Sequence, residues 1–403
     1  MPDSPSIRQA GAVQGWVLVA AAWLSVMANQ VLGPVLPGMT AYFHDQPRVD
    51  LLISLTATLP SLFIALLAAP FGVLGDRAGH KRVLFGATLF YGLAGTAPLW
   101  LPTLPQIVVS RSLVGIAEAA IMTCSTTLLI SHFHGAARGR YLALQTGTAP
   151  IVAVIVTLLG GALGNASWRN PFLIYGFAFL LIPLTGLLVW EPPRVTRGAD
   201  AHATTVVRAG DTESFGWGRF ALRCAVSGFA MLSFLVTAIQ TSFLVSERGL
   251  TAPGLIGRWV AISMLVNPIG AALFAALRWR SVTRLAVSFG LMGAGFAVMA
   301  HSGTWQAAIA GAAIANLGAG MILPTIADWT LGFLPGELRG RGSGLWFSSV
   351  FLGQFLSPLA VLGLRGLTGG LSSAIAVFAM ACLLAAVLAA GAALRRRPAA
   401  GAR

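Results

Sequence analysis

The sequence predicts an all-α membrane protein with 12 transmembrane helices, arranged as two six-helix pseudo-repeats around a central cavity. Three observations support this class: 56% of the 403 residues are hydrophobic, only 9% are charged, and long apolar runs alternate with short polar breaks. Soluble domains have about 25% charged residues. A soluble fold of this size exposes a large surface that polar groups must cover, so the composition fits the bilayer as solvent.

Twelve segments are apolar and long enough to span the hydrocarbon core, which needs roughly 20 helical residues. We expect spans at residues 16–39, 51–74, 82–101, 104–131, 140–162, 170–190, 218–245, 254–277, 283–301, 304–333, 342–365 and 370–394. The first segment is too long for the core of a signal peptide, and no A-x-A cleavage site follows it. We therefore expect it to be retained as the first helix.

A polar stretch at the middle of the chain divides these spans into two sets of six. We expect an N-terminal six-helix bundle at 1–190, a cytoplasmic linker at 191–217 and a C-terminal six-helix bundle at 218–403. The fourth span is followed by GAARGR (135–140), and the tenth by GELRGR (336–341). The same loop of each half thus carries the same pattern, which indicates an internal repeat.

The loop charges predict the orientation. With the N-terminus in the cytoplasm, the cytoplasmic segments carry 20 Lys and Arg residues, the opposite segments carry five, and Arg111 lies within a span. Cytoplasmic loops of membrane proteins have such an excess of positive charge. The chain has one lysine among its 26 basic residues, which is typical of a GC-rich bacterial genome. We expect a multi-pass protein of the bacterial inner membrane, with both termini cytoplasmic.

Several other classes of protein are excluded. The net charge of +14 lies in short loops between apolar runs, so we expect no nucleic-acid partner. Cys124, Cys224 and Cys382 are isolated from one another, and His132 and His134 do not share a helix face, so we expect no metal site. The chain has no phosphate-binding loop, nucleophile elbow or HExxH motif. We expect no enzyme activity and no cofactor.

The most specific motif is GVLGDRAGHKRVL at 72–84. It resembles the signature between helices two and three of the major facilitator superfamily, G-x-L-x-D-R-x-G-[RH]-[KR]-[KR]. The resemblance implies that this is a gating motif, in which Asp76 latches onto the start of helix eleven, near Gly340 to Ser343, in the outward-open state. The alternative is a basic cytoplasmic turn without a gating role, which only reflects the excess of positive charge in cytoplasmic loops. The motif residues are Gly72, Asp76, Arg77, Gly79, Lys81 and Arg82.

Further motifs resemble the drug:proton antiporter branch of that superfamily. LGPVLP at 32–37 is similar to the L-x-x-P-x-x-P end of helix one, and Arg111, Gly115 and Ala119 match the R-x-x-x-G-x-x-x-A pattern of helix four. Antiporters of this branch also carry G-x-x-x-G-P-x-x-G-G in helix five. Here that segment reads GTAP at 147–150, and its glycine pair is displaced by ten residues. This departure favours symport or uniport.

Two ionisable residues lie within the fourth span, where a charge is costly. Arg111 and Glu118 are seven residues apart and share one helix face. Their Cα atoms are about 10 Å apart, so a water or a shared partner on helix one or five would have to link them. We hypothesise that Glu118 carries a proton and that Arg111 sets its affinity; the alternative is a structural polar contact. We expect Asp328 to be structural, snorkelling or binding Arg339.

The resemblance implies that helices one, four, seven and ten line the cavity. The substrate-binding candidates on these helices are Asn29, Gln30, Met122, Gln240 and Asn316. The polar ones could equally form interhelical hydrogen bonds.

We expect proton-coupled efflux of small lipophilic or drug-like compounds by alternating access. The partners are then a small-molecule substrate, protons and the lipid bilayer, and we expect a monomer. One alternative is a proton symporter or facilitator for a polar metabolite. Another is a membrane enzyme or receptor, which would need a catalytic cluster that the sequence does not show.

Overall fold

The computed structural model describes residues 10–192, 215–277, 279–335 and 338–395, and the regular structure among them is entirely helical. The N-terminal half contains α1 (Ala12–Gln30), η1 (Gly33–Val35), α2 (Leu36–Tyr42), α3 (Val49–Ala78), α4 (His80–Thr96), η2 (Ala97–Leu99), α5 (Leu104–His132), α6 (Gly135–Gly164), η3 (Asn170–Gly176) and α7 (Phe177–Leu188). The C-terminal half contains α8 (Trp217–Glu247), α9 (Pro253–Met264), α10 (Asn267–Ala276), α11 (Ser281–Ala300), α12 (Trp305–Leu331), α13 (Arg339–Thr368) and α14 (Leu371–Arg395).

These helices confirm the predicted fold class. In the described chain, eleven stretches are long and apolar enough to cross a membrane. The predicted span that is not among these eleven is the third, at 82–101, which forms α4 and η2. Helix α4 has 17 residues and begins with His80, Lys81 and Arg82, so it is short and partly charged. Most of the predicted linker at 191–217 lies outside the described residues, which stop at 192 and resume at 215.

Prolines break two of the predicted spans into shorter helices. The first span is interrupted after Gln30, where Pro34 and Pro37 follow, and η1 and α2 complete the crossing. The eighth span is interrupted at Leu265 and Val266, just before Asn267 and Pro268 begin α10. Proline cannot donate the helical hydrogen bond, so each site is a natural helix boundary.

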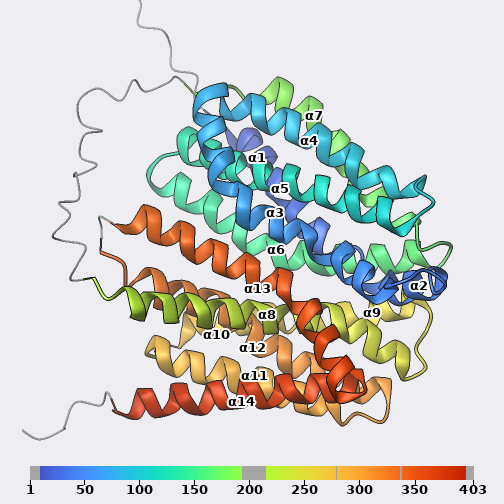
Figure 1. Ribbon diagram of the computed structural model, residues 1–403. Helices are drawn as coiled ribbons and strands as arrows, with labels where there is room; N and C mark the ends of the chain where they lie inside the picture. Colours follow the sequence, from blue (N-terminus) through green and yellow to red (C-terminus); the bar gives the residue numbers. More distant parts are fainter. Residues whose placement is uncertain (1–9, 193–214, 278, 336–337, 396–403) are drawn as a thin grey trace, which may run out of the picture.

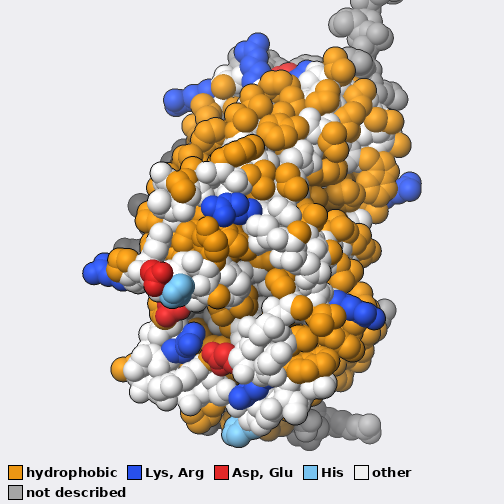
Figure 2. Space-filling model, turned by 90° about the vertical axis from the view of Figure 1, so that its right-hand side faces the viewer, with side chains coloured by type: hydrophobic (Ala, Val, Ile, Leu, Met, Phe, Trp, Pro, Cys, Tyr) orange, Lys and Arg blue, Asp and Glu red, His pale blue; other side chains and the backbone are white. Residues whose placement is uncertain are grey.

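The two halves form two layers, each with its own hydrophobic core. In Figure 1, the N-terminal half lies above the C-terminal half, and the layers meet where α3 runs beside α13 and α6 lies against α9. We call the end where α7 stops and α8 starts the linker end, and the opposite end, near α2, the far end. Figure 2 looks onto the far end, where acidic and basic side chains lie among apolar and uncharged groups.

Close backbone contact joins the halves at the far end. A Cβ added to Gly257 of α9 would lie 2.9 Å from the Cα of Gly161 of α6, so no larger residue fits at this crossing. Nearby, the Gly254 N–H donates to Asn165 Oδ1 at 2.8 Å. Towards the linker end, in contrast, a Cβ added to Gly139 of α6 would have no neighbour within 4 Å. The seam between the halves is therefore closed at the far end.

Candidate functional site: a buried polar network

Arg111 is the centre of a polar network inside the N-terminal half. Its side chain is fully buried on α5. Nη2 donates to the Ala28 carbonyl of α1 at 2.8 Å, and Nε donates to the Thr56 carbonyl of α3 at 3.1 Å. Nη1 donates to the Tyr175 hydroxyl of η3 at 2.5 Å. The planar guanidinium thus holds three elements of one bundle in a fixed arrangement.

The break in α1 explains why Ala28 accepts these bonds. Ala28 lies in the last turn of α1, where carbonyls have no intrahelical donor. Its oxygen accepts from Arg111 and also from the Tyr175 hydroxyl, at 3.2 Å. One turn earlier, the Leu24 carbonyl accepts from the Tyr91 hydroxyl of α4 at 2.6 Å. The free Ala28 carbonyl at this helix end is therefore satisfied by side chains from α5 and η3, and α4 adds a contact one turn earlier.

Glu118 lies in the same network but has no strong donor. Its side chain is fully buried, and neither carboxylate oxygen has a hydrogen-bond partner among the described residues. It interacts electrostatically with Arg111 and with the Ser25 hydroxyl of α1, although the Ser25 geometry does not meet a normal hydrogen bond. An ionised carboxylate in such a place is expensive unless nearby positive charge compensates it.

Arg111 and Glu118 thus face the interior of the N-terminal half, and their shared neighbour is α1. Two members of the network, Tyr91 and Tyr175, were not among the predicted site residues. Their ring centroids are 5.4 Å apart and both are fully buried. The sequence did carry a signal for these two residues, because the chain has only four tyrosines and both Tyr91 and Tyr175 lie within apolar spans.

The structure does not gather the substrate-binding candidates into one pocket. Gln240 is buried and lines a pocket at the far end. Asn316 donates to the Ser263 hydroxyl at 3.3 Å, and the Asn29 amide donates to the carbonyl of its own helix four residues earlier, at 3.0 Å. Gln30 and Met122 are partly buried. The Asn316 bond joins α12 to α9 and is of the interhelical kind that the sequence left open, whereas the Asn29 bond stays within α1.

The gating motif lies at the turn between α3 and α4. Gly79 has a φ of +100°, which a side chain would strain, and Gly72 packs towards Thr123 of α5. The Asp76 side chain is 73% exposed, and its carboxylate lies 3.7 Å from His80 Nε2. The expected latch between Asp76 and residues 340–343 stays a prediction. Arg77 and Arg82 are exposed.

Glu191 holds this turn and was missed by the sequence analysis. Its two carboxylate oxygens accept from the backbone N–H groups of His80 and Lys81, both at 2.8 Å. Lys81 Nζ in turn donates to the Gly186 carbonyl of α7 at 2.8 Å. A carboxylate at a helix N-terminus satisfies unpaired donors and complements the helix dipole. Glu191 therefore ties the start of the linker to the gating motif.

Asp328 has partners in α11 that the sequence analysis did not name. Its Oδ2 accepts from the Ser281 hydroxyl at 2.7 Å and lies 3.7 Å from Arg284 Nη2. Both partners belong to α11, whereas the sequence suggested Arg339, whose side chain lies outside the described residues. This contact joins two helices of the C-terminal half.

Comparisons with known proteins agree on the family. The family model described as Major Facilitator Superfamily matches residues 18–358. Multidrug resistance protein MdtM of Escherichia coli O157:H7 is 27% identical over 297 residues, which cover 69% of this chain and 70% of that protein. The 3-(3-hydroxy-phenyl)propionate transporter of Escherichia coli (strain K12) is 28% identical over 139 residues, 34% of each chain.

Solved structures show the same fold at low sequence identity. A bacterial homologue of the human lysosomal transporter Spinster, in an inward-facing and unoccupied conformation, has a TM-score of 0.76 at 16% identity and covers 99% of this chain and 100% of its own. A D-xylose–proton symporter has a TM-score of 0.73 at 16% identity, covering 94% and 96%. The matched family model, the helices and the gating motif lead to one conclusion: this chain is a multi-pass membrane transporter, not an enzyme, and belongs to the Major Facilitator Superfamily.

Proposed function

We propose that this transporter exports small lipophilic or drug-like compounds in exchange for protons, by alternating access between its two halves. The similarity to the multidrug resistance protein MdtM supports the substrate class. The linker end is then cytoplasmic, as the loop charges predict. In the present conformation, the closed far end separates the central path from the outside.

The observation that carries the proposal is the environment of Glu118. Its carboxyl is fully buried, has no hydrogen-bond donor among the described residues, and shares its network with the fixed charge of Arg111. Ionisable groups within the bilayer are expensive and mark proton relays in transporters. Glu118 takes up the proton, and Arg111 sets the balance between its two protonation states.

The network is placed to transmit that change. Both Arg111 and Tyr175 bind the Ala28 carbonyl at the end of α1. The chain continues from there into η1, which contacts α8 and α9 of the other half. A change of charge at Glu118 alters the attraction between α5 and α1, and α1 leads directly to the contact between the halves.

Proton release on ligand addition tests this mechanism. The purified protein in weakly buffered detergent is mixed with a panel of lipophilic cations and neutral antibiotics, and the pH change is recorded. We expect release by the wild type and none by Glu118→Gln. The matched control is Asp328→Asn, which removes a carboxyl in α12 that contacts Ser281 and Arg284; it should release protons like the wild type.

Either result of this experiment is informative. Release that persists in Glu118→Gln would remove Glu118 from the coupling step. Binding of a compound without any release by the wild type would exclude exchange of that compound for protons and favour the alternative below.

The second candidate is a proton symporter or facilitator for a polar metabolite. The displaced helix-five glycines favour it, because they depart from the antiporter pattern. In the structure, Gly160 and Gly161 lie at the far-end crossing, where they approach Val31 and Gly257. Its test is uptake into proteoliposomes: accumulation driven by an inwardly directed proton gradient identifies a symporter, and equilibration without a gradient identifies a facilitator.

A further inference from the structure

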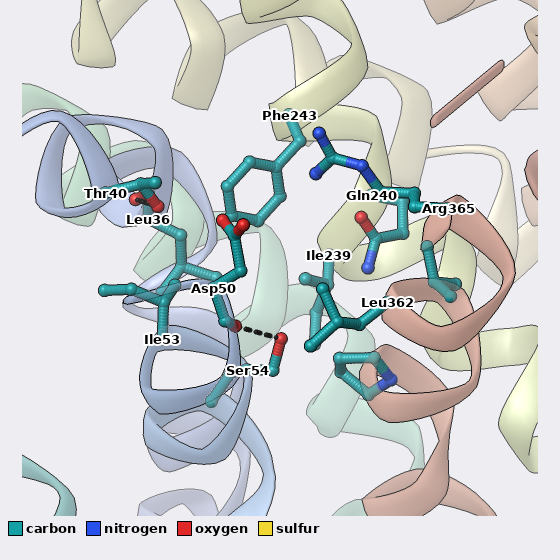
Figure 3. Close-up of a pocket in the computed structure, with 13 residues that line it drawn as sticks. Leu36, Thr40, Asp50, Ile53, Ser54, Ile239, Gln240, Phe243, Leu362 and Arg365 are labelled. Atoms are coloured by element: carbon teal, nitrogen blue, oxygen red, sulfur yellow. Dashed lines mark hydrogen bonds between the residues drawn. The ribbon is translucent and has the colours of Figure 1, made fainter. Parts of the chain in front are cut away.

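A pocket lies at the far end of the molecule, between the two halves (Figure 3). Its walls come from α2 and α3 of the N-terminal half and from α8 and α13 of the C-terminal half. Leu36, Ile239 and Phe243 provide part of its apolar lining. Because each half supplies part of the wall, the shape of this pocket depends on how the halves are arranged.

Two opposite charges face each other across the pocket. Asp50 lies in the first turn of α3, and Arg365 lies in the last turn of α13. Figure 3 shows the Asp50 carboxylate and the Arg365 guanidinium pointing into the space between the halves. No ion pair involving Asp50 is present among the described residues, and Arg365 is the basic residue that lines the same pocket.

Arg365 also has an acidic neighbour in its own half. Its Nη2 lies 3.7 Å from Oε1 of Glu247, at the end of α8. The two side chains are 36% and 43% exposed, so water weakens their attraction but does not abolish it. The distance exceeds that of a hydrogen bond, and the guanidinium keeps donors for a second acceptor.

The two attractions respond differently to alternating access. Glu247 and Arg365 belong to one half and stay together when the halves rotate as rigid bodies. Asp50 belongs to the other half, so its distance from Arg365 grows when the far end opens. Physiological salt screens charges that are farther apart than a Debye length of about 8 Å, so the attraction between Asp50 and Arg365 falls as the far end opens and favours the far-end-closed state.

We propose that Asp50, Arg365 and Glu247 form a far-end ion-pair clasp. Asp50 attracts Arg365 across the seam and holds the far end closed. Glu247 competes for the same guanidinium and weakens that attraction, so the far end can reopen in each transport cycle. The clasp shares no residue with the Arg111 network, and it does not depend on which ion drives transport.

Distances between spin labels measure the clasp directly. Nitroxides are attached at Ala166→Cys, in the loop after α6, and at Gly303→Cys, in the loop before α12, after the three native cysteines are replaced by alanine. Both positions are exposed at the far end, one on each half. Double electron–electron resonance in lipid nanodiscs then gives the ratio of far-end-open to far-end-closed molecules.

Asp50→Asn and Arg365→Gln should each raise the open-to-closed ratio about two- to five-fold, the range of an exposed ion pair. Their combination should exceed neither single change, because each already removes the same attraction. Glu247→Gln should lower the ratio, and it should have no effect once Asp50 is Asn. The matched controls are Asp45→Asn and Arg258→Gln, which are exposed far-end charges outside the pocket.

The clasp is refuted if Asp50→Asn and Arg365→Gln behave like the two controls, or if their effects add in the double variant. It is also refuted if Glu247→Gln raises the ratio, since Glu247 would then hold the far end closed itself. If the spin-label distances support the clasp while no proton release depends on Glu118, this inference stands and only the proposed proton coupling is overturned.

Discussion

At the scale of single residues, substitution of Arg111 removes several hydrogen bonds of one buried side chain. Its guanidinium donates to Ala28, Thr56 and Tyr175 at once. Lysine has one flexible charged group and cannot reproduce this fork. Hydrogen bonds from charged donors contribute about 1.5–3 kcal/mol each, so Arg111→Lys should lower the free energy of unfolding by about 3 kcal/mol. Thermal unfolding followed by tryptophan fluorescence in detergent measures the change.

Arg169→Lys is the control for that prediction. Arg169 is partly buried, donates to the Leu101 carbonyl at 3.3 Å and stacks on Trp168. Arg169→Lys should lower the free energy of unfolding by much less than Arg111→Lys. Equal losses at the two positions would mean that the network contributes no more than an ordinary surface contact.

The sequence could predict only part of this network. Helical spacing places Arg111 and Glu118 on one face, and the cost of charge within the bilayer marks both as special. The acceptors of Arg111 could not be predicted, because two of them are backbone carbonyls, which every residue has. The position of the α1 break decides which carbonyl is free, and that depends on how the prolines pack in three dimensions.

At the scale of elements, Glu191 connects α4 to the segment after α7. Glu191→Ala removes the acceptors of the His80 and Lys81 N–H groups. Loss of a helix N-terminal cap costs about 1 kcal/mol, so amide hydrogen exchange in a peptide covering 76–84 should become several-fold faster. Asp76→Ala is the control, because its carboxylate is exposed and lies 3.7 Å from the His80 ring rather than on a backbone N–H of α4. Equal acceleration by both changes would contradict the capping role.

The crossing of α6 and α9 leads to a second prediction at this scale. A side chain at Gly257 would collide with Gly161 and with the Thr157 carbonyl, each 2.9 Å from the added Cβ. Gly257→Leu should therefore push the halves apart at the far end, and a cysteine at Thr40 in the far-end pocket should react several-fold faster with a water-soluble maleimide. Gly363→Leu is the control, because its added Cβ has no neighbour within 4 Å. Unchanged labelling would show that this crossing does not seal the far end.

The helices themselves were largely predictable, since length and hydropathy decide which segments cross a bilayer. All twelve expected spans contain helix. The interior breaks were harder to predict: the α9–α10 break at Leu265 and Val266 lies within an apolar run, where hydropathy stays high. The partners of the gating motif were also hidden, because Glu191 binds backbone groups that no side-chain pattern reveals.

At the scale of the whole molecule, the remaining prediction is orientation. The loop charges place the linker end in the cytoplasm, and the close approach of α6 and α9 then closes the outer face of the membrane. Single cysteines at Ala166, at the far end, and at Arg138, at the linker end, test this in intact bacteria, with the native cysteines replaced. A membrane-impermeant maleimide should label Ala166→Cys at once and Arg138→Cys only after permeabilisation. The reverse pattern would invert the molecule, so the closed end would face the cytoplasm and the proposed export cycle would have to start from the opposite conformation.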